Sequence, residues 1–100
     1  MLQITDIALG DMEGIYNYIL NNLQSPENAV RQYNRIADAI EGLGLFPERI
    51  KIMNSEPEHT MGIRQLYVDN YSVFYIIRDK RVVIIRVLYS SSDISKRLLI

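Results

Sequence analysis

IRQLYVDNYSVFYIIRDKRVVIIRVLY, residues 63–89, is the stretch of sequence that decides the fold. It contains three runs rich in Val, Ile, Tyr and Phe, namely residues 63–68, 71–78 and 81–89. These residue types favour β-strands. The breaks between the runs, Asp69-Asn70 and Asp79-Lys80, are two residues wide, and Asn and Asp tolerate the left-handed backbone that hairpin turns require. The stretch therefore predicts a three-stranded antiparallel meander.

Arg86 is the only charged residue in the otherwise apolar run 82–89, so we expect the third strand to lie at the centre of the sheet. An Arg in such a run must find a carboxylate, carbonyl groups or an external anion, because an unpaired buried charge is very costly. Asp11 and Asp93 are acids that could pair with it. Arg64, in the first run, has the same requirement.

The sequence before the meander has the period of a helix. Ala8, Met12, Ile15 and Ile19 recur on one face of a predicted helix from about 7 to 23, which Thr5 or Asp6 can cap. Gly10 and Gly14 each weaken this helix by roughly 1 kcal/mol relative to Ala. We interpret them as the place where a second helix approaches closely.

A second helix begins at Ser25-Pro26-Glu27, with a hydroxyl at the N-cap, Pro at the first helical position and an acid in the first turn. Its core-facing stripe comprises Ala29, Tyr33, Ile36, Ile40 and Leu43. Gly42 or Gly44 is expected to supply the left-handed residue at its end, before Phe46-Pro47 prevents continuation. The short link between the helices predicts an antiparallel hairpin.

Three segments flank these elements. Residues 49–61 show no period and are expected to form a loop with a short extended piece, and residues 1–5 are expected to add an edge strand. Asp93 begins a short terminal helix or tail that carries Lys96 and Arg97. The fold class is therefore α+β, with an N-terminal helical hairpin packed on an antiparallel sheet.

Length and composition restrict the classes of function. One hundred residues, 48% hydrophobic and 23% charged, predict a single domain spanning residues 1–100. The absence of Cys excludes disulfides and thiolate metal sites, and a lone His59 in a polar loop argues against zinc. We expect no metal and no cofactor. No apolar run approaches the ~18 residues of a membrane span, and no secretory signal pattern follows Met1, so we expect a cytoplasmic protein.

The net charge of −1 conceals two halves of opposite sign. Residues 1–48 have a balance of −5, whereas residues 49–100 have a balance of +4. This asymmetry indicates a polyanion or an acidic partner for the second half, or it is without functional meaning.

Tyrosine is over-represented among the aromatic residues, with seven Tyr against two Phe and no Trp. Tyr33 belongs to the core stripe of the second helix. The phenols of the sheet could stack on a base, donate a proton or simply pack; they are Tyr67, Tyr71, Tyr75 and Tyr89. No glycine-rich phosphate loop is present.

In its order of motifs, the chain resembles the RelE/ParE superfamily of toxins from type II toxin–antitoxin systems. The residues that carry the resemblance are Ala8, Asp11-Met12-Glu13, Ile15-Tyr16 and Tyr18-Ile19, then Ser25-Pro26-Glu27, Leu43, Phe46-Pro47, Gly62-Ile63-Arg64, Leu66, Val68, Asn70-Tyr71, Val73-Phe74-Tyr75, Arg86-Val87-Leu88-Tyr89 and Asp93-Ile94. The resemblance implies a helical hairpin packed on a curved antiparallel sheet. It also implies a cytoplasmic toxin that a co-expressed antitoxin neutralises by wrapping it with a flexible segment.

Two activities divide the superfamily. RelE-like members cleave mRNA in the ribosomal A site, using basic residues to stabilise the transition state, whereas ParE-like members inhibit DNA gyrase. The RelE-type pattern places an Arg after the second-strand Tyr and a basic cluster after the last strand. This sequence has Ser72 at the first position and Ser90-Ser91-Ser92 at the second. These departures, together with Arg64 and the Ser-Pro-Glu helix start, favour the ParE-like branch.

The resemblance therefore implies a toxin that inhibits a cellular target, DNA gyrase by analogy, and that needs no nuclease residues, although whether the chain is an enzyme stays open. Two alternatives stay open: a ribosome-dependent endoribonuclease acting on mRNA, and a decayed toxin that only binds its antitoxin. Arg64, Arg86 and Tyr89 are the candidate catalytic residues of the ribonuclease. The candidates for contact with the target or the antitoxin are Arg64, Tyr67, Tyr71, Lys96 and Arg97.

Overall fold

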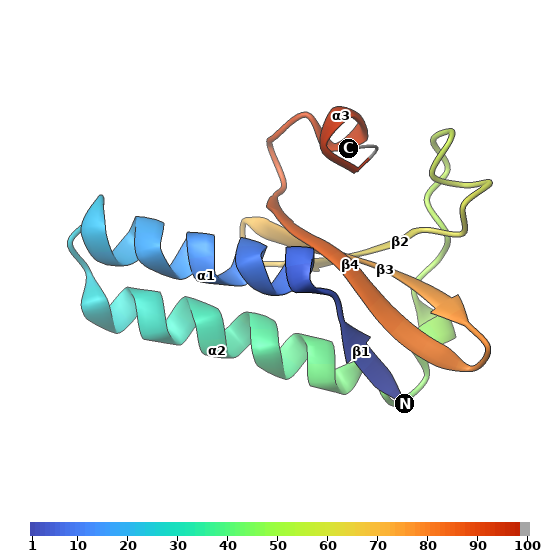
Figure 1. Cartoon of the computed structure of the whole chain (residues 1–100), viewed down its shortest axis with the longest axis horizontal. Helices are drawn as coiled ribbons and strands as arrows, with labels where there is room; N and C mark the ends of the chain where they lie inside the picture. The colour runs from blue at the N-terminus through green and yellow to red at the C-terminus, as the bar shows by residue number, and fades with distance from the viewer. Residues whose placement is uncertain (99–100) are drawn as a thin grey trace.

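Two antiparallel helices, α1 (Asp6–Asn21) and α2 (Pro26–Gly42), form the first half of the chain in this computed structural model, which describes residues 1–98 (Figure 1). The last two residues of the predicted domain lie outside the described residues. Thr5 caps α1, since its side-chain oxygen accepts a hydrogen bond from the Ala8 N–H at 3.2 Å. The core stripes lie as predicted, with Met12 of α1 and Ile36 and Ile40 of α2 buried.

Two details of the second helix differ from the sequence predictions. Ser25 precedes α2, but its side chain makes no capping hydrogen bond, because its backbone (φ −131°, ψ 81°) departs from the extended geometry of a capping Ser. The left-handed residue is neither Gly42 nor Gly44 but Phe46, with a φ of 55°. The reason is a run of tight turn bonds that continues past the helix, including Gly44 N–H to Glu41 O at 3.0 Å.

The second half forms a four-stranded sheet with β1 from the N-terminus. Its strands are β1 (Leu2–Ile4), β2 (Arg64–Val68), β3 (Tyr71–Arg78) and β4 (Arg81–Tyr89), in the order β1-β4-β3-β2. The predicted meander and the central position of the third strand are confirmed. The edge strand near the N-terminus is also present, but β1 pairs with β4 in parallel. No short turn joins these two strands, so nothing in their connection imposes the antiparallel direction.

The turns of the meander use the left-handed backbone that their residues predicted. Asp69 has a φ of 56°, and Asp79 and Lys80 have φ values of 51° and 63°. The segment between α2 and β2 contains a short 3₁₀ helix, Pro47–Arg49, and an extended bridge from Ile52 to Arg64. That bridge is the short extended piece that the sequence predicted.

Each face of the sheet has its own apolar cluster. The face toward α1 and α2, which we call the front face, buries Val73, Tyr75 and Val87 against the helices. The opposite back face buries Ile63, Phe74 and Leu88, and α3 (Ile94–Leu98) packs there through Ile94 and Leu98. Figure 1 shows α3, in red, on the other side of β4 from the helical hairpin. The short terminal helix is thus where the sequence predicted one.

Among residues 1–98, none of the helices combines the length and the apolar character needed to cross a membrane.

Candidate functional site

Asp11 and Arg86 join α1 to β4. The Arg86 guanidinium donates to Asp11 through Nε to Oδ2 at 2.7 Å and Nη2 to Oδ1 at 2.9 Å. Asp11 Oδ2 also accepts the Val87 backbone N–H at 2.9 Å, which β1 is too short to pair. The hydrogen bonds to Asp11 raise the pKa of Arg86, against the opposing effect of burial. Of the two acids that the sequence offered to Arg86, the structure selects Asp11.

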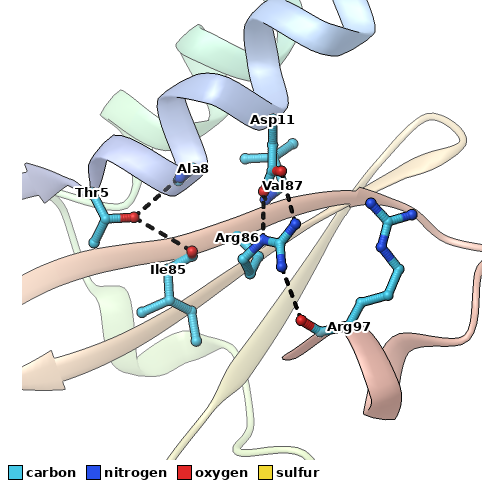
Figure 2. A network of polar contacts seen from close by, with 7 residues as sticks. All are labelled: Thr5, Ala8, Asp11, Ile85, Arg86, Val87 and Arg97. Atoms are coloured by element: carbon cyan, nitrogen blue, oxygen red, sulfur yellow. Dashed lines mark hydrogen bonds and ion pairs between the residues drawn. The ribbon is translucent and has the colours of Figure 1, made fainter. Parts of the chain in front are cut away.

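Arg86 also reaches the terminal helix. Its Nη1 donates to the backbone carbonyl of Arg97 at 2.9 Å, so that one guanidinium connects α1, β4 and α3 (Figure 2). A single Arg therefore satisfies a carboxylate on one side and a helix carbonyl on the other. Because these bonds occupy Nε, Nη1 and Nη2, Arg86 is a structural residue in this conformation.

Arg64 is engaged in a different way, at the far end of the sheet from Tyr71. Its Nη1 donates to the carbonyl of Ile50 at 2.5 Å and to that of Glu48 at 3.4 Å. Its Nε is buried without a hydrogen-bond partner among the described residues. Arg64 therefore holds the segment after Pro47 against the sheet, and its partners are carbonyls rather than an acid.

An open groove runs between α1 and the ends of β3 and β4. It has a volume of about 790 Å³. Its lining residues come from α1 and the helix link, from the turn between β2 and β3, from β3 and β4, and from α3; they are Gly10, Asp11, Gly14, Ile15, Tyr18, Leu23, Asn70, Tyr71, Val87, Leu88, Tyr89 and Arg97. We call this the front groove.

Three phenols gather in the front groove. Tyr71 and Tyr89 stack edge to face, with ring centroids 5.8 Å apart and planes at 71°. Burial raises the pKa of Tyr71, and the neighbouring phenols of Tyr89 and Tyr18 add to the rise. Tyr18 and Leu23 are 52% and 58% exposed, so the groove presents apolar surface to solvent.

Gly10 and Gly14 face this groove and not α2. A Cβ built on either glycine meets no atom within 4 Å, so the interpretation that they mark a close approach of the two helices is wrong. The glycines instead leave the wall of the groove without side chains. Sequence reasoning missed Tyr18 and Leu23 as well, although the four-residue spacing of Gly10, Gly14 and Tyr18 puts all three on one helix face.

The structure brings together some of the predicted site residues and separates others. Tyr71, Tyr89 and Arg97 line the front groove. Tyr67 is 66% exposed on β2 and does not line it. Lys96 is exposed on α3, with its Nζ 3.8 Å from Asp93 Oδ2.

The positions where the RelE-type pattern has cations are filled by a buried hydroxyl pair. Ser72 is fully buried, accepts a hydrogen bond from Gln65 Nε2 at 3.0 Å, and lies with its Oγ 2.7 Å from Ser90 Oγ. Because side chains alternate along a strand, Ser72 points to the back face while Tyr71 points into the front groove. These hydroxyls join the ends of β3 and β4 and bring no positive charge.

Among residues 1–98, no three His, Cys, Asp or Glu side chains gather in a way that could hold a metal ion. Within the front groove, the charge of Asp11 is paired with Arg86, and the exposed lining comprises phenolic and aliphatic side chains together with Asn70 and Arg97. Such a surface is suited to binding a polypeptide segment with apolar side chains.

The chain is similar to known toxin families. A family model described as ParE toxin of type II toxin-antitoxin system, parDE, matches residues 2–94. No curated protein sequence matches the chain significantly.

Two solved structures share the fold. A chain of the chromosomal ParDE TA system from P. aeruginosa superimposes with a TM-score of 0.74 and 24% sequence identity, covering 88% of this chain and 92% of the other. A chain of the toxin–antitoxin complex RelBE2 from Mycobacterium tuberculosis does so with a TM-score of 0.65 and 20% identity, covering 89% and 95%. At these identities the likeness is one of fold.

Proposed function

Because the chain belongs to the ParE toxin family of type II toxin–antitoxin systems, we propose that a cognate antitoxin neutralises it by binding in the front groove. We further propose that the unbound chain inhibits DNA gyrase in the cytoplasm. The observation that carries the first proposal is the front groove itself, an open channel in which the apolar surfaces of Tyr18 and Leu23 are exposed. A channel of this kind is typical of a surface that a partner covers.

The occupant proposed for the groove is a polypeptide segment with apolar or aromatic side chains. Tyr18, Tyr71 and Tyr89 offer ring faces and edges to such side chains. The bare backbone at Gly10 and Gly14 allows the segment to lie close to α1. Arg97 at the rim can pair with an acid of the segment. A disordered segment that folds into such a groove is a common mode of recognition.

Inhibition by binding, rather than RNA cleavage, is favoured by the state of the candidate catalytic residues. Arg64 and Arg86 are both held in intramolecular hydrogen bonds, and Ser72 and Ser90 stand where the ribonuclease pattern has cations. A phosphoryl-transfer site needs cations aimed at the developing negative charge, and losing one typically costs about 10²–10³-fold in rate. Tyr89 and Arg97 line this groove and are the residues available there for RNA cleavage. Because they are present, RNA cleavage is the second candidate function.

The target is tested by inducing the chain alone in a bacterial host and pulse-labelling DNA and protein synthesis. We expect DNA synthesis to fail first and the purified chain to block supercoiling by gyrase. If protein synthesis fails first and cleaved messages accumulate, the ribonuclease is the correct alternative. If growth continues normally, the chain is a decayed toxin whose remaining activity is antitoxin binding.

The groove is tested by a matched pair of leucine substitutions. Leu23 lines the front groove, whereas Leu45 lies outside it, and the two are 58% and 71% exposed. Both substitutions should therefore leave the fold intact. We expect Leu23→Asp to weaken binding of the cognate antitoxin at least about tenfold and Leu45→Asp to have little effect, measured by calorimetry. Equal affinities for the two variants would exclude the front groove as the antitoxin site.

A further inference from the structure

A second concave surface lies on the back face of the sheet, beside the first turn of α1. It is a cleft of about 500 Å³ whose walls are mostly aliphatic. The aliphatic residues are Ile7, Met61, Ile63, Ile76, Ile85 and Leu98. We call it the back-face cleft. Ile7 and Met61 are 60% and 53% exposed at its mouth.

Cations that form no salt bridge with any residue among 1–98 lie at one end of this cleft and next to it. Arg78 lines it, and Arg81 lies directly opposite Arg78 in the antiparallel register of β3 and β4. Directly opposite residues share a face of the sheet with Cβ atoms about 4.5–5.5 Å apart, so the Arg81 side chain begins next to that of Arg78 on the face that carries the cleft. Lys80 in the connecting turn adds a third positive charge, and Asp79 is the only acid of the turn.

This arrangement is unfavourable for the isolated chain. Like charges directly opposite each other destabilise a strand pair. Of the salt bridges found between residues 1–98, none involves Arg78, Lys80 or Arg81. Lys80 also takes a φ of 63°, a left-handed conformation that is unfavourable for a residue with a Cβ. An external anion placed between the two Arg side chains would relieve the repulsion.

We propose that the back-face cleft binds an acidic peptide segment of a partner protein, with an aliphatic side chain in the cleft and carboxylates at Arg78 and Arg81. Residues 49–100 have a charge balance of +4. The proposal assigns part of this positive charge to a specific surface, the end of the back-face cleft at Arg78 and Arg81. The proposal does not depend on the front groove, because the two surfaces have no lining residue in common.

A peptide fits this surface better than a nucleic acid does. Binding to a nucleic acid depends on neutralising many phosphates and, for single strands, on aromatic side chains that stack on bases. The cleft has aliphatic walls, and its other guanidinium, Arg86, is already paired with Asp11. The exposed phenols of Tyr67 and Tyr89 do not line the cleft.

The test measures binding of a dye-labelled 12-residue peptide by fluorescence anisotropy, using the full chain. The peptide carries two Leu residues followed by four Glu residues; a second peptide has Gln in place of each Glu, and a 12-nucleotide oligothymidine is the third probe. We expect the Glu peptide to bind at least about tenfold more tightly than the Gln peptide. Arg78→Glu/Arg81→Glu should abolish this preference. Arg31→Glu/Lys96→Glu, with the same change in net charge away from the cleft, should preserve it.

A third variant tests the aliphatic part of the cleft. Ile7 lies in the first turn of α1, where an acid is favourable to the helix, so Ile7→Asp should fold normally while repelling the peptide. Equal binding of the Glu and Gln peptides, or no binding of either below about 1 mM, would overturn the proposal. So would tighter binding of oligothymidine that depends on Arg78 and Arg81, or a dimer of the chain that Ile7→Asp dissociates.

Discussion

Asp11 Oδ2 lies 2.7 Å from Arg86 Nε, and the same oxygen accepts the Val87 N–H at 2.9 Å. The pair thus closes the free edge of β4 beyond β1 and, through the bond from Arg86 to the Arg97 carbonyl, holds α3 on the back face. Both side chains are largely buried, with 18% and 13% of their surface exposed for Arg86 and Asp11. A pair in this position therefore contributes to the stability of the fold.

Asp11→Asn should therefore destabilise the chain. The substitution keeps the size of the side chain but leaves the Arg86 charge without its counter-ion, which we expect to cost about 1–3 kcal/mol. Urea unfolding at neutral pH measures the change. Asp93→Asn is the control, because the Asp93–Lys96 pair is exposed and 3.8 Å long, and it should unfold like the wild type. If the two variants unfold at the same urea concentration, the Asp11–Arg86 pair makes no contribution to the free energy of unfolding.

Asp69 should make stability sensitive to acid. Hydrogen bonds from Arg35 and then Gln32 hold the pKa of its carboxyl below the ordinary value. A lowered pKa in the folded state stabilises the fold above the unfolded value of about 3.9, and this contribution is lost as the pH falls through the folded pKa. The wild type should therefore be more stable than Asp69→Asn at pH 7, and the difference should vanish in acid. Asn tolerates the left-handed backbone at this position, so the comparison isolates the charge.

The same comparison at the second turn of the meander provides the control. Asp79 also has a left-handed backbone but takes part in no salt bridge among residues 1–98. At pH 7, Asp79→Asn should therefore lower the stability less than Asp69→Asn does. If both variants lose the same amount of stability, the loss comes from the change of residue in the turn rather than from the Asp69–Arg35 pair.

Tyr89→Phe distinguishes inhibition by binding from RNA cleavage. The Tyr89 hydroxyl makes no hydrogen bond with other residues among 1–98, and the ring contact with Tyr71 survives in Phe. We therefore expect unchanged stability and unchanged growth arrest on induction. Loss of growth arrest with normal folding would identify the phenol as a proton donor or acceptor. Arg86→Ala is a poorer test, because removing its bonds to Asp11 disturbs the fold.

The elements of the fold were predictable because their signals are local. The stripe of α2 and the three apolar runs with two-residue breaks fix the helices and the meander without reference to distant residues. The partner of Arg86 was not predictable, since Asp11 and Asp93 were equally available in the sequence and only the packing of α1 on β4 selects one. The parallel direction of β1 also depends on that packing, because three residues carry no signal for direction.

The site was predicted less completely than the fold. Tyr71, Tyr89 and Arg97 were named from the resemblance, and the structure gathers them in one groove. The direction in which Gly10 and Gly14 face was mistaken because a glycine on a helix has no side chain to indicate whether its surface is buried. Their role depends on what lies opposite α1, and this can be seen only in three dimensions.

Gly14→Ala separates the stability of α1 from the function of the front groove. Ala is favoured over Gly inside a helix by about 0.5–1 kcal/mol, and a Cβ at this position meets no atom within 4 Å, so the variant should unfold at a higher urea concentration. The added methyl group narrows the proposed antitoxin site, and we expect weaker antitoxin binding together with the gain in stability.

Gly42→Ala is the matched control, since Gly42 ends α2, has equal space around it and does not line the groove. That variant should bind the antitoxin like the wild type. If Gly14→Ala also binds with unchanged affinity, the antitoxin segment does not lie close to α1, and its contacts must come from the tyrosine side of the groove.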